Sequence, residues 1–148
     1  MIPIAVSSVL RRKDSRVISI DPEVSVYDAI SLMAENSIGA LLVVSNGTLV
    51  GILSERDYAR KVVLQSRSSK DTRVCDIMSS PVVAVSPGDT VEACMHLMTE
   101  KRIRHLPVVE GTTIVGIVSI GDLVRSMITV QGETIQYLQQ YISGPYPG

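Results

Sequence analysis

The stretch Gly51-Ile-Leu-Ser-Glu-Arg-Asp57 decides the fold, because it returns 65 residues later as Gly116-Ile-Val-Ser-Ile-Gly-Asp122. The match extends outward from this stretch. Residues 17–62 align with residues 82–127 without a gap, and 17 of the 46 aligned positions are identical. An internal repeat indicates two similar units packed together. A functional site is therefore expected in two copies or between the units.

Each repeat predicts the same order of elements. Short β-branched runs at residues 17–20 and 82–85 come first. Apolar residues at the i, i+3, i+4, i+7 spacing of an amphipathic helix follow, at positions 26, 29, 30, 33 and again at 91, 94, 95, 98. Two apolar strands come next, at 41–44 and 49–53 or at 106–109 and 114–118, and a last helix starts at Ser54 or Ser119. The expected fold is α/β of the α+β type, with two β-α-β-β-α units.

The remaining chain divides around these units. We expect an N-terminal segment at 1–16, repeat 1 at 17–66, a connector and lead-in at 67–81, repeat 2 at 82–129 and a C-terminal segment at 130–148. In the last segment, apolar residues at helical spacing predict an amphipathic helix over 133–142. Its apolar face needs a cover, either from the same module or from a partner subunit.

Composition argues against several classes of protein. The 148 residues carry a net charge of −1 and contain neither Phe nor Trp, so neither a basic surface nor a stacking platform for nucleic acid is expected. The longest apolar run, residues 40–44, is too short to cross a membrane. Residues 1–16 lack the apolar core of a signal peptide. We expect a cytoplasmic protein, or one in an organelle matrix if that segment is a remnant of a transit sequence.

The residues that carry metal or catalytic chemistry are scattered. Cys75 and Cys94 form no CxxC pair, and Cys94 falls on the apolar helix face as a small core residue. His96 and His105 have no neighbouring metal ligands in the sequence. No nucleophile, base and orienting residue can be assembled from them. We expect no metal, no catalytic cofactor and no enzyme activity.

The repeated motif can be interpreted in two ways. In each copy a buried strand ends at a serine, and an aspartate follows three residues later in the first turn of a helix. The helix N-terminus and the serine hydroxyl suit a phosphate, and the carboxylate can accept both hydrogens of a ribose diol. The alternative is a capping box, which uses the same residue types. A single copy favours the cap, whereas recurrence in register favours a binding site.

These features resemble a tandem pair of cystathionine β-synthase (CBS) domains, a Bateman module, of the stand-alone type. The resemblance covers residues 17–128. It rests on the two motifs, on Leu-Pro-Val-Val at 106–109, on helix stripes ending in Met33 and Met98, and on Val-Cys-Asp-Ile-Met-Ser-Ser-Pro at 74–81. It implies that the repeats pack by pseudo-twofold symmetry and enclose two clefts. Members of this family bind AMP, ADP, ATP, NAD or S-adenosylmethionine there.

The resemblance also implies which residues form the clefts. One cleft would contain Ile52, Ser54 and Asp57 and be closed by Ile103, Arg104 and His105. The other would contain Ile117, Ser119 and Asp122 and be closed by Ile38, Gly39 and Ala40.

The two clefts are expected to be unequal. Arg56, Arg104 and His105 can meet phosphate at the Asp57 site. The aligned positions near Asp122 are Gly121, Gly39 and Ala40. We therefore expect a phosphate-binding Asp57 site and a weaker Asp122 site. The alternative is that both arginines are solvated and that the histidine is an ordinary half-buried side chain.

The expected function is regulatory. The module would bind an adenosine ligand, with AMP or NAD favoured, and signal to a partner protein whose identity the sequence does not reveal. The alternative is a structural dimerisation module with empty clefts. In either case the resemblance implies a homodimer.

Overall fold

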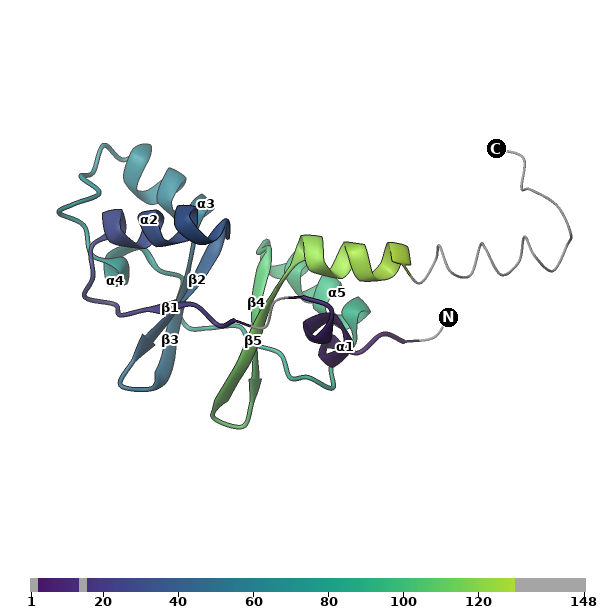
Figure 1. The fold of residues 1–148 in the computed structure, drawn as a ribbon. Helices are drawn as coiled ribbons and strands as arrows, with labels where there is room; N and C mark the ends of the chain where they lie inside the picture. Colours follow the sequence, from purple (N-terminus) through teal and green to yellow (C-terminus); the bar gives the residue numbers. More distant parts are fainter. Residues whose placement is uncertain (1–2, 14–15, 130–148) are drawn as a thin grey trace, which may run out of the picture.

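The computed structural model describes residues 3–13 and 16–129, and its elements form two units (Figure 1). The first unit contains β1 (Ser19–Ile20), α2 (Val26–Asn36), β2 (Ala40–Ser45), β3 (Thr48–Ser54), α3 (Glu55–Tyr58) and a π-helix, η1 (Ala59–Val63). The second contains α5 (Val91–Lys101), β4 (His105–Glu110), β5 (Thr113–Ser119) and a helix that covers residues 120–129. The helix predicted over 133–142 lies outside the described residues.

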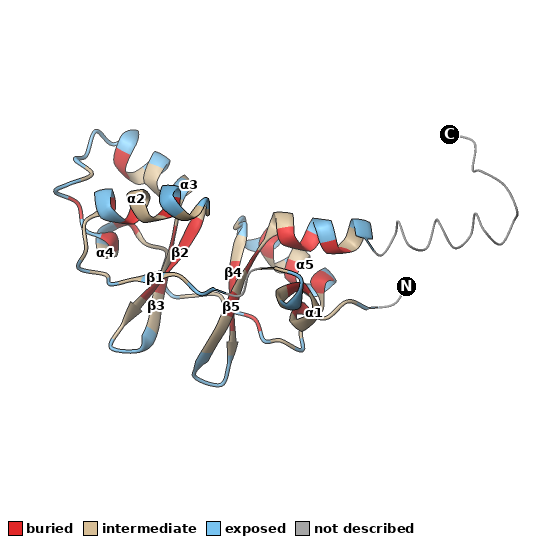
Figure 2. Ribbon diagram, in the orientation of Figure 1, coloured by how far each residue is buried: buried red, intermediate tan, exposed pale blue. Residues whose placement is uncertain are grey.

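The long helix of each unit follows the predicted apolar stripe. The buried residues of the two helices occupy aligned positions: Val26, Ala29 and Met33 in α2, and Val91, Cys94 and Met98 in α5. In Figure 2 buried residues, in red, lie along the strands of both units, and the hairpin turns are exposed. Each helix begins at a hydroxyl cap, because Ser25 accepts from the backbone of Asp28 and Thr90 from that of Ala93. Capping and periodicity together place the helices as predicted.

The strands form one small sheet in each unit. In the first unit the strand order is β1-β2-β3, with β1 parallel to β2 and β2 antiparallel to β3. Asn46 and Gly47 connect β2 to β3 with φ of 50° and 79°. Two positive φ values in a two-residue hairpin loop are typical of a type I′ turn. The Asn-Gly pair therefore made the predicted hairpin.

The strand predicted at residues 82–85 is wrong in extent. Among the residues that the structure describes, the sheet of the second unit consists of β4 and β5, and Val85 forms an isolated parallel bridge to Val108. Val85 donates to the carbonyl of Pro107 at 3.0 Å and accepts from Val109 at 2.8 Å. Pro107 has no N–H with which to continue the parallel ladder toward residue 83. The first unit has Leu42 at this position and keeps a two-residue strand.

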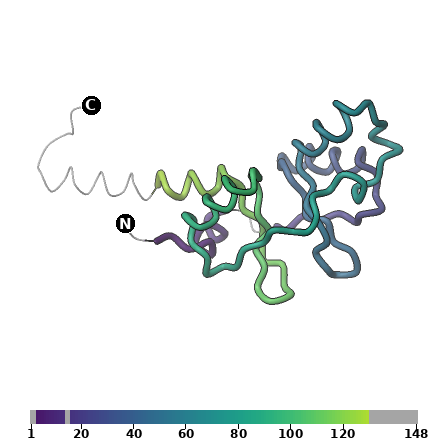
Figure 3. Tube along the Cα trace, turned by 180° about the vertical axis from the view of Figure 1, so that it is seen from behind, coloured from purple at the N-terminus to yellow at the C-terminus, as the bar shows by residue number. Residues whose placement is uncertain are grey.

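The segments that precede the two repeats are exchanged between the units. Helix α1 (Val6–Arg11) lies against the second unit, and α4 (Val74–Ile77) lies against the first (Figures 1 and 3). Val6 and Val9 are buried in the core of the second unit, whereas Val74 and Ile77 are buried in that of the first. Residues 3–13 are therefore part of the second unit, although the sequence had suggested a separate segment.

Backbone hydrogen bonds repeat this exchange in both units. Val74 donates to Val24 at 2.9 Å, and Val6 donates to Asp89 at 2.8 Å. Likewise, the backbone N–H of Val26 donates to the carbonyl of residue 72, and that of Val91 donates to the carbonyl of residue 4, both at 2.8 Å. Residues 4–10 thus correspond to residues 72–78, at an offset of 68. This correspondence supports the expected pseudo-twofold relation.

The exchange explains the glycine that opens each motif. A Cβ added at Gly51 would lie 2.5 Å from Met78 Sδ, and one added at Gly116 would lie 2.8 Å from Leu10 Cδ2. Both approaches are closer than packed atoms tolerate. In each unit a side chain of the exchanged lead-in packs directly over the strand and would have to shift to admit a Cβ.

Candidate functional site

A cleft of about 400 Å³ opens beside Asp57 and is lined by both units. It brings together seven residues that the sequence had assigned to this site: Ile52, Ser54, Arg56 and Asp57 from the first unit, and Ile103, Arg104 and His105 from the second. They meet because β3 ends at Ser54 where the chain of the second unit enters β4. The volume lies within the range of small-molecule sites.

Ser54 and Asp57 form the capping box that was one of the two interpretations. Ser54 Oγ accepts from Asp57 N at 3.1 Å, and Asp57 Oδ2 accepts from Ser54 N at 3.0 Å. The other carboxylate oxygen, Oδ1, faces Lys61 Nζ at 3.2 Å and Ser79 Oγ at 3.4 Å. Because Asp57 caps the helix while it lines the cleft, the cap and the binding site are compatible.

The cleft is rich in positive charge. Five cationic residues line it against two carboxylates, those of Glu55 and Asp57; the cations are Arg56, Arg60, Lys61, Arg102 and Arg104. Such an excess of cations suits an anionic group.

Sequence reasoning missed several of these residues. Lys61 was detectable, since it lies one helical turn after Asp57. Ser79 and Pro81 were not, because they reach the cleft with the exchanged lead-in of the second repeat.

His105 lies at the contact between the units. It begins β4 opposite Ser119, and a Cβ added at Gly39 would lie 3.5 Å from its Nε2. Burial lowers the pKa of His105 against the opposing effect of the Asp122 carboxylate. The imidazole is therefore mainly neutral at pH 7. Its ring takes space that a larger residue at position 39 would need.

The residues expected to close the second site, at positions 38–40, lie at the entrance to β2. Gly39 lines the Asp57 cleft, beside His105. Ala40 is buried at the start of β2 opposite Ser54, and Ile38 packs against the core of the first unit. Of these three residues, Gly39 alone is among those that line the Asp57 cleft.

Asp122 has the same cap as Asp57 but different partners. Ser119 Oγ accepts from Asp122 N at 3.1 Å, and Asp122 Oδ2 accepts from Ser119 N at 2.9 Å. The aspartate is only 8% exposed, and its carboxylate binds Lys13 Nζ and Arg125 Nη2, each at 2.7 Å. Lys13 Nζ also donates to the carbonyl of Ile117 at 2.9 Å. The two motif copies therefore share a backbone cap and differ in what their carboxylates bind.

These contacts shift the pKa of Asp122. Burial alone would raise it, but the hydrogen bonds from Lys13 and Ser119 and the charge of Lys13 outweigh burial and leave the pKa below its ordinary value. Lys13 could not be assigned this role from sequence, because it lies 109 residues from Asp122.

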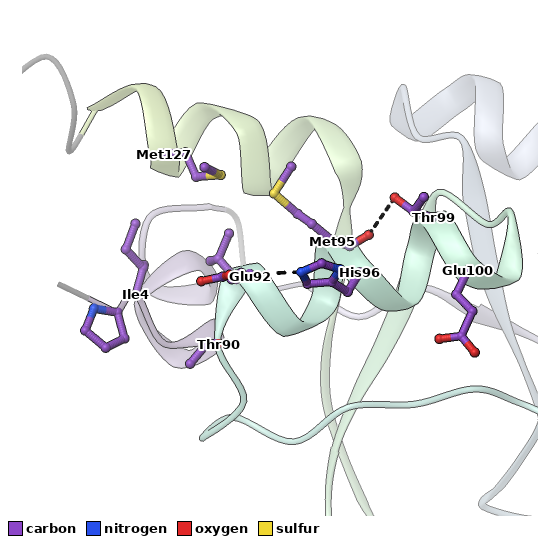
Figure 4. Close-up of a pocket in the computed structure, with 10 residues that line it drawn as sticks. Ile4, Thr90, Glu92, Met95, His96, Thr99, Glu100 and Met127 are labelled. Atoms are coloured by element: carbon purple, nitrogen blue, oxygen red, sulfur yellow. Dashed lines mark hydrogen bonds and ion pairs between the residues drawn. The ribbon is translucent and has the colours of Figure 1, made fainter. Parts of the chain in front are cut away.

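A larger hollow of about 660 Å³ lies over α5, between residues 3–4 and the helix over 120–129 (Figure 4). Ile4, Val91, Met95 and Met127 make most of its lining apolar. Glu92 and His96 stand at its rim, 4.0 Å apart and both largely exposed. The hollow contains neither motif serine nor motif aspartate.

Other site chemistries find little support in the part of the chain that the structure describes. Within residues 3–13 and 16–129, no three His, Cys, Asp or Glu side chains are grouped to hold a metal ion. No helix in these ranges is long and apolar enough to cross a membrane. Cys94 is buried in the core as predicted, and burial raises the pKa of its thiol to about 11.

Comparison with known proteins places both units in one family. The model of the CBS domain matches residues 6–64 and 74–129. The chain is 46% identical over 127 residues to the mitochondrial CBS domain-containing protein CBSX3 of Arabidopsis thaliana; the match covers 82% of this chain and 62% of that protein. The chain thus spans less than two thirds of that relative.

Solved structures share the fold. A CBS-domain protein from Burkholderia ambifaria MC40-6 is 52% identical, with a TM-score of 0.82 over 84% of this chain and 94% of that one. The CBS domain pair of protein MJ0100, solved with 5′-methylthioadenosine and S-adenosyl-L-methionine, is 24% identical, with a TM-score of 0.75 over 85% and 97%. CBS pairs are non-catalytic regulatory modules, in agreement with the prediction that this chain is not an enzyme. The chain belongs to the CBS domain family, as a tandem pair of CBS domains.

Proposed function

We propose that this protein binds a phosphate-bearing adenosine ligand in the Asp57 cleft and that occupancy of the cleft signals to a partner protein. The observation that supports the proposal is the composition of the cleft. A carboxylate at a helix N-terminus, apolar side chains from both units and an excess of cations share one volume of about 400 Å³.

Each group has a role that suits an adenine nucleotide. The Asp57 carboxylate accepts hydrogen bonds from the ribose diol, and the Ser54 hydroxyl contacts a phosphate. Arg56 and Arg104 approach from opposite units and neutralise that phosphate. Ile52 and Ile103 supply the apolar surface for the adenine base. Because these groups come from both repeats, binding favours one relative placement of the units over others, which is what a signal requires.

The charge of the cleft favours some adenosine ligands over others. AMP and NAD carry one or two phosphates, and we favour them; ADP and ATP also offer the anionic charge that five cationic side chains attract. S-adenosylmethionine carries a sulfonium cation, which this cleft disfavours. MJ0100, the distant relative solved with that ligand, is similar to this chain in fold.

Calorimetric titration tests the proposal. AMP, ADP, ATP, NAD and S-adenosylmethionine are titrated into the protein, and each titration is repeated with Asp57→Ala. We expect saturable binding of the phosphate-bearing ligands and its loss in the variant. Arg104→Ala should weaken AMP and leave adenosine, which lacks phosphate, nearly unchanged. If no ligand bound, or if Asp57→Ala bound AMP as tightly as the unmodified protein, the proposal would fail.

A second candidate is a dimerisation or interaction module, and the apolar hollow over α5 favours it. Ile4, Met95 and Met127 present an apolar surface of the kind that a partner covers (Figure 4). We propose a homodimer formed through this helix face. Light scattering of the purified protein measures its mass directly, and Met95→Glu should shift a dimer to a monomer. Nucleotide titration of the same variant separates dimerisation from ligand binding.

For localisation, we propose the cytoplasm or an organelle matrix. The relative CBSX3 is a mitochondrial protein, which makes the matrix a specific alternative. A fluorescent fusion to the C-terminus of the chain distinguishes the two compartments.

A further inference from the structure

The two motif copies make the same backbone hydrogen bonds, but their aspartates contact different cations. At Asp57 the motif faces an open cleft, and its nearest cation, Lys61, comes from the same helical segment at 3.2 Å. At Asp122 a cation arrives from a distant part of the chain, since Lys13 Nζ lies 2.7 Å from Oδ2. The same ammonium donates to the carbonyl of Ile117 at 2.9 Å. Lys13 thus takes both the motif carboxylate and a backbone acceptor two residues before the motif serine.

Pseudo-symmetry shows which contact Lys13 replaces. The lead-in segments correspond at an offset of 68 residues over 4–10 and 72–78, and they diverge beyond these residues because α1 runs to Arg11 whereas α4 ends at Ile77. In the first unit the carbonyl of Ile52 accepts from Ser79 N at 2.8 Å, whereas in the second unit the carbonyl of Ile117 accepts from Lys13 Nζ at 2.9 Å. Lys13 therefore takes the carbonyl that a backbone N–H takes in the first unit, and it adds a direct contact with the motif carboxylate.

We infer that Lys13 is an internal competitor that closes a second adenosine site at Asp122. The inference rests on the proposed function, because it assigns the same ligand class to the second copy of the motif. A ligand hydroxyl must replace the ammonium at Asp122 before it can bind. The apparent affinity of the second site is then reduced by the fraction of time that Lys13 occupies it.

The competitor can leave without unfolding its segment. Lys13 lies beyond the last residue of α1, Arg11, while Val6 and Val9 hold that helix in the core. Its side chain is 29% exposed and ends a flexible four-carbon stem. Rotation of this stem into solvent frees Asp122, which retains Arg125 as a partner. The second site therefore opens and closes by a side-chain movement, so it can be closed while the first site is occupied.

AMP titration with counted stoichiometry tests the inference. The unmodified protein should bind one AMP per chain, and Lys13→Ala should bind two. Lys13→Arg keeps a cation at the carboxylate and should stay at one. Arg12→Ala removes the same charge from an exposed neighbour in the same segment and should also stay at one. Adding Asp122→Ala to Lys13→Ala should abolish only the second site. Circular dichroism confirms that each variant is folded.

The outcomes separate this inference from the proposed function. Two AMP per chain in the unmodified protein, or no additional AMP in Lys13→Ala, would overturn the internal competitor. If the unmodified protein bound no AMP, Lys13→Ala bound one, and the added Asp122→Ala abolished that binding, the competitor would be upheld and the Asp57 site refuted. If Asp57→Ala loses AMP binding and Lys13→Ala still binds one additional AMP, both the competitor and the Asp57 site are supported.

Discussion

The ion pair between Lys13 and Asp122 should stabilise the fold measurably more than its counterpart in the first unit. The perturbation is a double-mutant cycle of Lys13→Met and Asp122→Asn. Both substitutions keep approximate size and remove charge. The matched cycle uses Lys61→Met and Asp57→Asn, because that pair joins the same motif aspartate to a lysine at 3.2 Å.

The expected magnitudes follow from exposure and distance. Asp122 is 8% exposed and Lys13 29%, at 2.7 Å, so their coupling is that of a charge-assisted hydrogen bond in a partly buried setting, about 2 kcal/mol. Lys61 is 44% exposed, and its pair with Asp57 has the i,i+4 spacing of a helix surface pair, about 0.5 kcal/mol. Salt should weaken the second coupling more than the first.

Urea unfolding at pH 7, followed by circular dichroism, measures both cycles. The coupling free energy is the departure of each double variant from the sum of its single variants. Thermal melting gives a second measure, since about 1 kcal/mol corresponds to a shift of roughly 2–4 °C in Tm for a chain of this size. If the Lys13 cycle gave no more coupling than the Lys61 cycle, the assignment of Lys13 as a tightly held partner would be refuted.

Three other predictions concern packing and pH. Gly116→Ala should destabilise the fold by about 1–3 kcal/mol, because its Cβ would meet Leu10; Gly111→Ala, at a turn with open space around it, measures the cost of positive φ alone in the same unfolding assay. Val6→Ala, in α1, should cost about 1–3 kcal/mol although it lies outside both repeats, and an unchanged urea midpoint would contradict the exchanged packing. Because the pKa of Asp122 is lower in the folded chain than its ordinary 3.8, its contribution is present above that pH and is lost as pH falls through the folded value. Between pH 5 and pH 3, the free energy of unfolding of Asp122→Asn should therefore fall less than that of the unmodified protein.

Elements that depend on residues close together in the chain were predicted well. The stripes of α2 and α5, their hydroxyl caps and the Asn-Gly hairpin depend on contacts within a few positions of the chain. The strand at residues 82–85 was overestimated because its length depends on the partner strand. Pro107 was visible, but only the paired structure shows that its missing N–H falls on the ladder that this strand would use.

The residues expected at Asp57 line one cleft, and the repeat pointed to them because it placed the two motifs in register. The resemblance then named the opposite wall, at Ile103, Arg104 and His105, and the cleft contains all three. Lys61 was overlooked although it follows Asp57 by one helical turn. Glu55, Arg60 and Arg102 were also overlooked, although each lies within three residues of a predicted site residue. Ser79 and Pro81 arrive with the exchanged lead-in, whose partners are far away in sequence.

Periodicity, caps and the 65-residue repeat were sufficient to establish two similar units, each with a Ser-x-x-Asp motif at the start of a helix. These features are local, so a linear reading recovers them. Tertiary structure alone decided that Lys13 meets Asp122. The exchange of lead-ins carries Lys13 across 109 residues to Asp122 and places Pro81 in the lining of the Asp57 cleft. Long-range packing, rather than the motif itself, therefore places one aspartate beside an open cleft and pairs the other with a distant lysine.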